Sequence, residues 1–209
     1  MTVNAPKTRR LRTRFAKYEI PKALIYEEYE GKPIYYKGFL EVMNHIKTFE
    51  EIMGESHIQA IMVSCLIEFL LDNINRKKFI VSTNEVGLHL KKSNNLSSDI
   101  VIYDRELFTS LPVSKKYLTK PPLTVIEIDI KADTEAFGMS EVDYYSMKTK
   151  RLLEFGVKEL VWFFTANQQQ MVARPGQDWV ISDWDKTITI LDEYSFSMKG
   201  LLDQNGFKL

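Results

Sequence analysis

The 209-residue sequence has one cysteine, no long apolar run and no glycine-rich nucleotide-binding motif. The single thiol, Cys65, excludes an internal disulfide framework and a zinc site built from several cysteines. The longest apolar stretch, 60–71, is too short to span a bilayer and is interrupted by Glu68. Walker-type, dinucleotide-binding and Gly-x-Ser-x-Gly motifs are also absent. We therefore expect a cytoplasmic globular protein with no membrane segment, outside the enzyme classes that those motifs mark.

The sequence also lacks net charge, because 28 lysine and arginine residues balance 28 aspartate and glutamate residues. This balance hides an asymmetry: six positive charges precede the first acid, Glu19, which leaves 22 bases against the 28 acids. The six basic residues are Lys7, Arg9, Arg10, Arg12, Arg14 and Lys17. A block of like charge is usually a solvated tail. The other interpretation is an arm that contacts nucleic-acid phosphates.

Hydrophobic patterning divides the chain into a basic extension, 1–18, and one domain, 19–209. The elements expected in the domain are a weak helical region at 39–53, a helix at 57–75, strands at 79–82, 86–90, 99–103 and 123–130, a helix at 140–155 ended by Gly156, and strands at 160–165, 172–173, 179–182 and 187–191. This order of helices and strands predicts a mixed α/β domain.

The strand expected at 123–130 carries an unusual set of charged residues at its carboxyl end. Side chains alternate between the two faces of a strand, so Glu127, Asp129 and Lys131 should share one face while isoleucines occupy the other. Two carboxylates and a lysine beside a buried strand are costly unless they pair with one another or bind a cation. Mg²⁺ is such a cation, because it prefers carboxylate and carbonyl oxygens. The alternative is an edge strand whose polar face meets solvent.

Another acid, Asp99, opens the strand expected at 99–103 and stands 28 residues before Glu127. If these two strands pair as neighbours, Asp99 and Glu127 can share one metal ion. Lys148 then lies in the following helix, eight residues before Gly156. Two acids on adjacent strands with a nearby lysine form a minimal apparatus for phosphodiester hydrolysis, in which a metal polarises the phosphate and the lysine stabilises charge or orients water.

The segments that carry these residues resemble, in order and spacing, the Uma-two family of endonuclease-like proteins, a branch of the PD-(D/E)xK superfamily. The matching segments are His57-Ile-Gln-Ala-Ile-Met, Ser98-Asp99-Ile-Val-Ile-Tyr, Val125-Ile-Glu127-Ile-Asp129 and Lys148-Thr-Lys-Arg-Leu152-Leu-Glu-Phe-Gly156-Val157-Lys-Glu159. The likeness extends over about residues 20–195 and lies in spacing more than in identity. It implies a restriction-endonuclease-like core, with a central mixed β-sheet flanked by helices.

The resemblance also implies an activity: hydrolysis of DNA with Mg²⁺ or Mn²⁺. A homodimer or higher homo-oligomer is expected because cleavage of two strands commonly uses two sites. The residues implied for metal binding are Asp99, Glu127 and the carbonyl of Ile128, and the implied catalytic lysine is Lys148. The superfamily usually places its lysine two residues after the second acid, where this chain has Asp129. The alternative register Asp129-Ile-Lys131 restores that spacing, so Asp129 and Lys131 are the second choice.

Several positions depart from the family pattern. Ser98 replaces a proline, Leu152 stands where a tyrosine is usual, and Phe164 stands where the following strand usually has an aspartate. The segment after Glu127 is also more highly charged than usual. These departures support a second hypothesis, that the chain is a catalytically inactive relative acting as an oligomeric binding or scaffold module.

Two residues of the 57–75 helix are further candidates for the same site. His57 begins this helix and Glu68 interrupts its apolar sequence. The alternative for His57 is a helix cap or a hydrogen-bonded core histidine. The alternative for Glu68 is a buried salt bridge.

Overall fold

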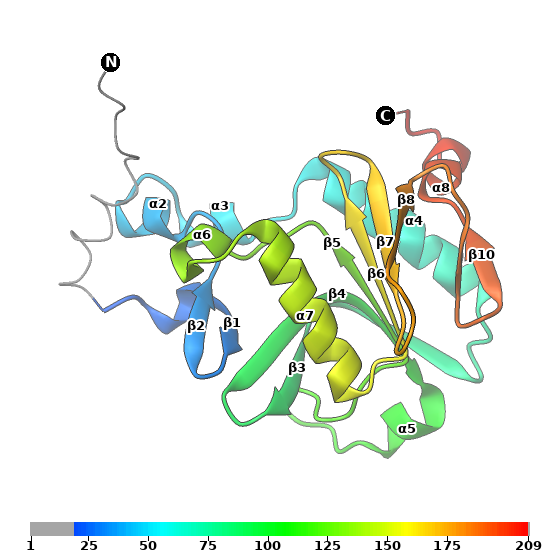
Figure 1. Cartoon of the computed structure of the whole chain (residues 1–209), viewed down its shortest axis with the longest axis horizontal. Coiled ribbons are helices and arrows are strands. Elements are labelled where there is room, and N and C mark those ends of the chain that lie inside the picture. The colour runs from blue at the N-terminus through cyan, green and yellow to red at the C-terminus, as the bar shows by residue number, and fades with distance from the viewer. Residues whose placement is uncertain (1–18, 209) are drawn as a thin grey trace.

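The computed structural model describes residues 19–208, so the predicted basic extension at 1–18 lies outside the described residues. Within that range eight strands form one mixed sheet, in which β5 and β6 are parallel and the other neighbouring pairs are antiparallel. The strands are β1 (Ile25–Tyr29), β2 (Lys32–Tyr35), β3 (Phe79–Lys91), β4 (Asn94–Asp104), β5 (Thr124–Ile128), β6 (Glu159–Phe164), β7 (Gln169–Ala173) and β8 (Val180–Asp183). The predicted mixed sheet flanked by helices is confirmed (Figure 1).

Helices cover both faces of this sheet, with α7 on one side and α4 on the other (Figure 1). The helices are α2 (Phe39–Met43), α3 (Phe49–Met53), α4 (His57–Asn73), α5 (Arg105–Ser110), α6 (Thr134–Phe137), α7 (Glu141–Phe155) and α8 (Met198–Gln204), preceded by the 3-10 turn η1 (Lys22–Leu24). Strands β9 (Ile188–Ile190) and β10 (Tyr194–Phe196) form a separate pair. Within residues 19–208, no helix combines the length and the apolar character that crossing a membrane requires.

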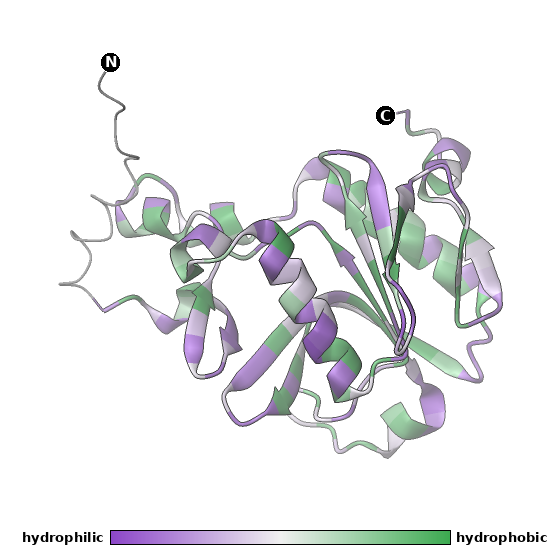
Figure 2. Ribbon diagram, in the orientation of Figure 1, coloured by the Kyte–Doolittle hydropathy of each residue, from purple (hydrophilic) through white to green (hydrophobic). Residues whose placement is uncertain are grey.

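The two faces of the sheet bury separate hydrophobic clusters. Ile100, Ile126 and Ile128 pack on the side of α4 and α8, whereas Val125 and Trp162 pack on the side of α7. This division follows the period of two along each strand. Figure 2 shows hydrophobic residues along the central strands, whereas α7 carries both hydrophilic and hydrophobic residues. Any polar group that faces the sheet from α7 is therefore buried beside this apolar cluster and needs polar partners there.

Helix α7 directs one charged residue toward the sheet. The helix begins with a capping box at Ser140. Its buried residues Tyr144, Lys148 and Leu152 are spaced by four, which places them on one face of the helix. Lys148 therefore lies in the middle of a buried stripe and points into the α7 side of the sheet.

Two different strands, β1 and β5, pair with the same side of β4. One edge of β4 pairs with β3 along its length. On the other edge β1 pairs near the start of β4, through Glu28 and Asn95, and β5 pairs farther along, through Ile100 and Ile126. The segment 97–99 therefore lies where β1 and β5 meet.

The β3 region differs from its prediction. Instead of two strands at 79–82 and 86–90, the chain forms one strand with a bulge at Asn84 and Glu85. Both residues have positive φ, 76° and 53°, which shifts the pairing with β4 while letting the strand continue. The bulge turns Glu85 out of the ladder. Helix α8 is a separate difference, because the sequence pattern did not predict a helix there.

Gly156 joins α7 to β6 and offers a test of how tightly this connection is packed. Gly156→Ala should lower the free energy of unfolding more than Gly138→Ala. Both residues end a helix with positive φ, 118° and 91°, where a Cβ costs about 1–2 kcal/mol. Only at Gly156 would the added Cβ approach a neighbour, Pro121 Cγ at 3.0 Å. Urea denaturation measures both losses, and equal losses would show that the contact with Pro121 has no effect.

Candidate functional site

Three carboxylates converge where β1 and β5 meet beside β4. Asp99 of β4 lies one residue beyond the Ile100–Ile126 pair, so it stands opposite Glu127 of β5. Both acids are on the α7 side, because the alternating isoleucines face α4. Residues directly opposite in an antiparallel pair have Cβ atoms about 4.5–5.5 Å apart. The structure therefore brings Asp99 and Glu127 together, and Glu27 of β1 lies beside them.

Asp99 is fixed by hydrogen bonds to both of its carboxylate oxygens. Oδ2 accepts the backbone N–H of Ile128 at 2.8 Å, and Oδ1 accepts Lys131 Nζ at 3.0 Å. The Asp99 carbonyl oxygen accepts the hydroxyl of Thr83 at 2.8 Å. Only 6% of the Asp99 side chain is exposed. The bond to Ile128 links this acid to the residue that directly follows Glu127.

Glu127 is buried and only partly hydrogen-bonded. Its side chain is 1% exposed, and Oε2 lies 3.1 Å from Lys148 Nζ. Oε1 is buried and, within residues 19–208, has no hydrogen-bond partner. Desolvation raises the pKa of Glu127 from about 4.5 to about 8; Lys148 opposes this shift, whereas Asp99 and Glu27 add to it. Burial and the neighbouring carboxylates therefore favour the protonated form of Glu127.

Lys148 lies between two glutamates. Its Nζ is 2.9 Å from Glu27 Oε1 and 3.1 Å from Glu127 Oε2, and its side chain is 1% exposed. The rings of Tyr26 and Trp162 are each 5.6 Å from the ammonium nitrogen. Desolvation disfavours the charged amine, but Glu127 and Glu27 outweigh it and raise the pKa of Lys148 above its usual value. The ammonium is a permanent positive charge at the centre of the site.

Glu27 is a member of the site that the sequence analysis did not identify. Its Oε1 accepts the backbone N–H of Ser97 at 3.0 Å, and its Oε2 accepts the Tyr144 hydroxyl at 2.6 Å. Together with Lys148, these groups bind Glu27 to β4 and to α7. The sequence gives only a weak indication of this role, because Glu27 lies in a short aromatic segment, 25–29. So short a segment does not establish which side chains of a strand face the core.

Lys131 faces the same carboxylates from a more exposed position. Its Nζ is 3.0 Å from Asp99, 3.2 Å from Glu85 and 3.8 Å from Glu55, and its side chain is 14% exposed. Desolvation acts against the charge, but Asp99 and Glu85 raise the pKa of Lys131. The β3 bulge supplies Glu85, which also accepts the Tyr36 hydroxyl at 2.9 Å. Lys131 thus occupies the solvent side of Asp99.

Asp129 does not join this group, although strict alternation along β5 predicts that it should. Its φ of 57° ends β5 at Ile128 and breaks the alternation of side chains. The Asp129 carboxylate accepts the N–H of Thr165 at 2.8 Å and the hydroxyl of the same residue at 2.6 Å. The chain then turns so that Lys131 returns to Asp99. The alternative register Asp129-Ile-Lys131 therefore places only its lysine at the carboxylates.

The structure does not bring the two α4 candidates to the carboxylates. His57 is exposed at the first position of α4. Glu68 is exposed on the same helix, which packs on the opposite side of the sheet from Asp99 and Glu127. A different α4 residue reaches the site: Gln59 Nε2 donates to the Ile128 carbonyl at 3.2 Å.

The oxygen donors match a hard divalent cation in kind. Asp99 and Glu127 offer carboxylate oxygens, Ile128 offers a carbonyl, and Glu127 Oε1 is buried without a partner. In the part of the chain that the structure describes, no group of three His, Cys, Asp or Glu side chains is arranged around a common metal position. Mg²⁺ commonly binds through one or two carboxylates and takes its other ligands from water and substrate phosphates. The residues present therefore fit Mg²⁺ or Mn²⁺ in this mode.

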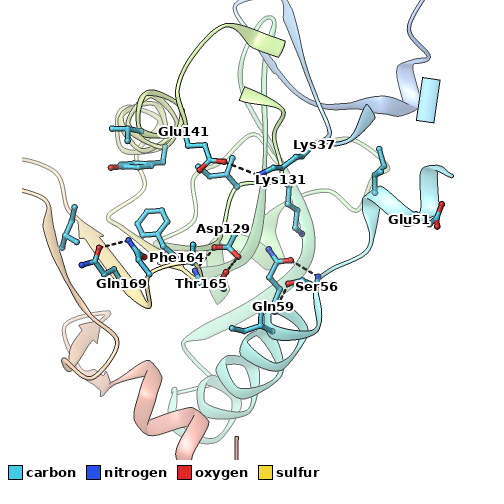
Figure 3. A pocket seen from close by; sticks show the side chains of 18 of the residues that line it. Lys37, Glu51, Ser56, Gln59, Asp129, Lys131, Glu141, Phe164, Thr165 and Gln169 are labelled. Carbon is cyan, nitrogen blue, oxygen red and sulfur yellow. Dashed lines mark hydrogen bonds and ion pairs between the residues drawn. The ribbon is translucent and has the colours of Figure 1, made fainter. Parts of the chain in front are cut away.

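A cavity of about 830 Å³ opens next to the carboxylates. Lys131 and Gln59 line it, and each also contacts the acid cluster, through Asp99 and the Ile128 carbonyl respectively. Figure 3 shows these side chains together with Asp129, Thr165 and other lining residues. Among the described residues that line the cavity, neither Lys148 nor the acids Asp99 and Glu127 are found, so Lys131 and Gln59 separate it from the acid cluster. A ligand in the cavity would therefore meet Lys131 before it met Lys148.

The raised pKa of Glu127 predicts a pH-dependent contribution to stability. The folded protein holds this proton more tightly than the unfolded chain, so the contribution is complete below about pH 4.5 and is lost as the pH rises through about 8. Without metal, Glu127→Gln should remove this loss and be more stable than wild type at pH 8.5, by up to a few kcal/mol. Urea denaturation in EDTA at pH 5.5, 7 and 8.5 measures it. Parallel pH profiles for both proteins would contradict the shift.

Comparison with known proteins identifies a fold relative. No family model matches the chain, and no curated protein matches it. A solved structure from Anabaena variabilis ATCC 29413, described as "a putative nuclease belonging to DUF820", superposes with a TM-score of 0.61 at 15% sequence identity. The match covers 91% of this chain and 96% of that chain. The chain therefore shares the fold of a nuclease-like protein over nearly its whole length, and its sheet and flanking helices are consistent with a restriction-endonuclease-like core.

Proposed function

We propose that this protein is a metal-dependent endonuclease that hydrolyses phosphodiester bonds in DNA. The observation that carries the proposal is the pairing of Asp99 and Glu127 across β4 and β5, beside a buried lysine that contacts Glu127. The resemblance to the Uma-two family and the fold shared with a protein described as a putative nuclease support it. The basic residues at 7–17 would add phosphate contacts, and the chain would act as a homodimer with two such sites.

In this proposal Asp99, Glu127 and the Ile128 carbonyl hold Mg²⁺ or Mn²⁺. When bound, the metal polarises the phosphate and lowers the pKa of water. Lys148 stabilises the ionised form of Glu127, because its ammonium lies 3.1 Å from Oε2. Glu27 is a positioning residue, since it holds Lys148 through a 2.9 Å contact without facing the cavity. The buried lysine thus lowers the cost of ionising Glu127 in an apolar setting, which would favour cation binding there.

Lys131 has a separate role in the proposal, because it lines the cavity. Its ammonium balances Asp99 in the absence of metal. With a divalent cation held by Asp99, Lys131 would be free to contact a substrate phosphate from the cavity side and to stabilise its negative charge. The two lysines therefore act on different partners: Lys148 acts on the ligand Glu127, and Lys131 acts on the substrate.

The alternative function is an inactive nuclease fold that serves as an oligomeric binding or scaffold module. The observation that favours it is the ion pair between Lys131 and Asp99 Oδ1: because Oδ2 accepts the N–H of Ile128, both oxygens of Asp99 have a partner without any metal. In that case the lysine is a permanent replacement for a cation. The two functions differ in whether a divalent ion can compete with Lys131.

Cleavage of plasmid DNA and of circular single-stranded DNA with Mg²⁺ or Mn²⁺ tests the nuclease proposal. Glu127→Gln and Asp99→Asn should each lower the rate by about 100-fold or more, because each removes a charged oxygen ligand. Glu68→Gln is the matched control and should cleave like wild type, since Glu68 lies on the opposite side of the sheet. Cleavage that persists unchanged in purified Glu127→Gln would remove this residue from the mechanism.

Titration with Mn²⁺ tests the competition at Asp99. Lys131→Met should bind Mn²⁺ more tightly than wild type, on the order of tenfold, because a competing positive charge is gone, yet it should lose DNA cleavage. Lys37→Met is the control, since Lys37 also lines the cavity but pairs with Glu141 at 3.2 Å. Calorimetry that finds no Mn²⁺ binding to wild type or to Lys131→Met would favour the scaffold function.

A further inference from the structure

The cavity beside the carboxylates has an aromatic wall. Phe164, at the end of β6, lines the cavity with a half-buried ring. Its ring is parallel to that of Trp162, with an interplanar angle of 4° and a centroid distance of 6.0 Å. Tyr145 of α7 also lines the cavity, and its centroid is 5.3 Å from that of Phe164. Because Trp162 is fully buried behind it, Phe164 is supported from within and presents ring surface to the cavity.

Side-chain amides stand next to this aromatic surface. Asn167 Nδ2 donates to Gln169 Oε1 at 2.8 Å, and both residues line the cavity. Figure 3 shows the Phe164 ring on the same wall as Gln169, with Asp129 and Thr165 alongside. Amides offer donors and acceptors that match the edges of nucleobases. The wall thus combines a flat apolar surface with paired polar groups.

The charges around the cavity largely cancel. The charged lining residues are Lys37, Lys47, Lys131, Glu51, Asp129 and Glu141, three of each sign. Lys37 pairs with Glu141 at 3.2 Å, and Lys131 pairs with Asp99 at 3.0 Å. Among residues 19–208 the lining therefore has no excess of positive charge with which to hold a phosphate backbone, and we expect ring surface to add most of the affinity for a ligand there. The cavity volume is within the range of sites that enclose one small organic group.

From these observations we propose that the cavity is a subsite for one unpaired nucleobase of single-stranded DNA, stacked on Phe164. The proposal rests on the nuclease function and gives it a substrate class. A base in a duplex already stacks on its neighbours and hides its faces, whereas an unpaired base can enter a pocket and stack on an aromatic ring. Lys131 lies between the cavity and Asp99, so a base held there places an adjoining phosphate near the carboxylates.

Binding of single-stranded DNA in EDTA tests the subsite without cleavage. The probe is a fluorescent 15-nucleotide strand with 2-aminopurine at its centre, titrated with full-length wild type, Phe164→Leu and Phe164→Trp. Stacking on an aromatic ring is worth about 1–3 kcal/mol per base, so Phe164→Leu should weaken binding about 5- to 150-fold. Wild type and Phe164→Trp should quench the 2-aminopurine signal, and Phe164→Leu should not.

A matched control and a second probe keep the test independent of folding. Phe137→Leu changes another half-buried phenylalanine, which packs against Tyr29 outside the cavity, and it should bind and quench like wild type. A strand of the same length made of abasic nucleotides should bind wild type at least tenfold more weakly than the strand with bases. The blunt duplex should also bind more weakly.

Equal affinity of wild type and Phe164→Leu for the single strand would overturn the subsite, and so would equal affinity of wild type for the abasic and the normal strand. Duplex binding as tight as single-strand binding, or a preference for the corresponding RNA strand, would overturn the assignment to single-stranded DNA. Because this binding is measured without metal, it is separate from the cleavage assay. Base stacking without any cleavage would overturn the nuclease proposal alone. Cleavage without stacking would overturn the subsite alone.

Discussion

The ion pairs of buried Lys148 hold together the elements that form the site. Taking a charge out of water costs several kcal/mol per ion, so a lysine that is 1% exposed requires close partners. Glu27 and Glu127 are those partners, and they come from β1 and β5, the two strands that meet beside β4. One ammonium group therefore connects α7 with two strands that do not pair with each other. The positions of the carboxylates depend on this contact.

Charge balance then explains the unusual properties of Glu127. Three buried carboxylates, those of Glu27, Asp99 and Glu127, face one buried ammonium and the partly exposed Lys131. The surplus of negative charge and the lack of water raise the pKa of Glu127 to about 8. A proton and a divalent cation are alternative ways to neutralise that surplus. The same constraint that makes Glu127 easy to protonate therefore makes the cluster a candidate metal site.

Sequence periodicity predicted part of this arrangement. The period of two placed Glu127 on one face of β5, and the strand opened by Asp99 did become its neighbour. Periodicity could not show that Asp129 turns away from the acids. The φ of 57° at this residue ends the alternation of side chains, and the chain then brings Lys131 back to Asp99. The contribution of Glu27 was also hidden, since it depends on β1 meeting β5 along β4, a contact between distant parts of the chain.

The formal neutrality of the chain does not exclude nucleic acid as a partner, because a few basic residues can attract phosphate locally and a base can bind by stacking. We propose that Asp99 and Glu127 hold a divalent cation where β1 and β5 meet. Anomalous diffraction from crystals soaked in Mn²⁺ tests this proposal. We predict a peak within coordination distance of both carboxylates and of the Ile128 carbonyl, with Lys131 displaced from Asp99. A structure in which Lys131 stays on Asp99 and no manganese binds there would contradict the account.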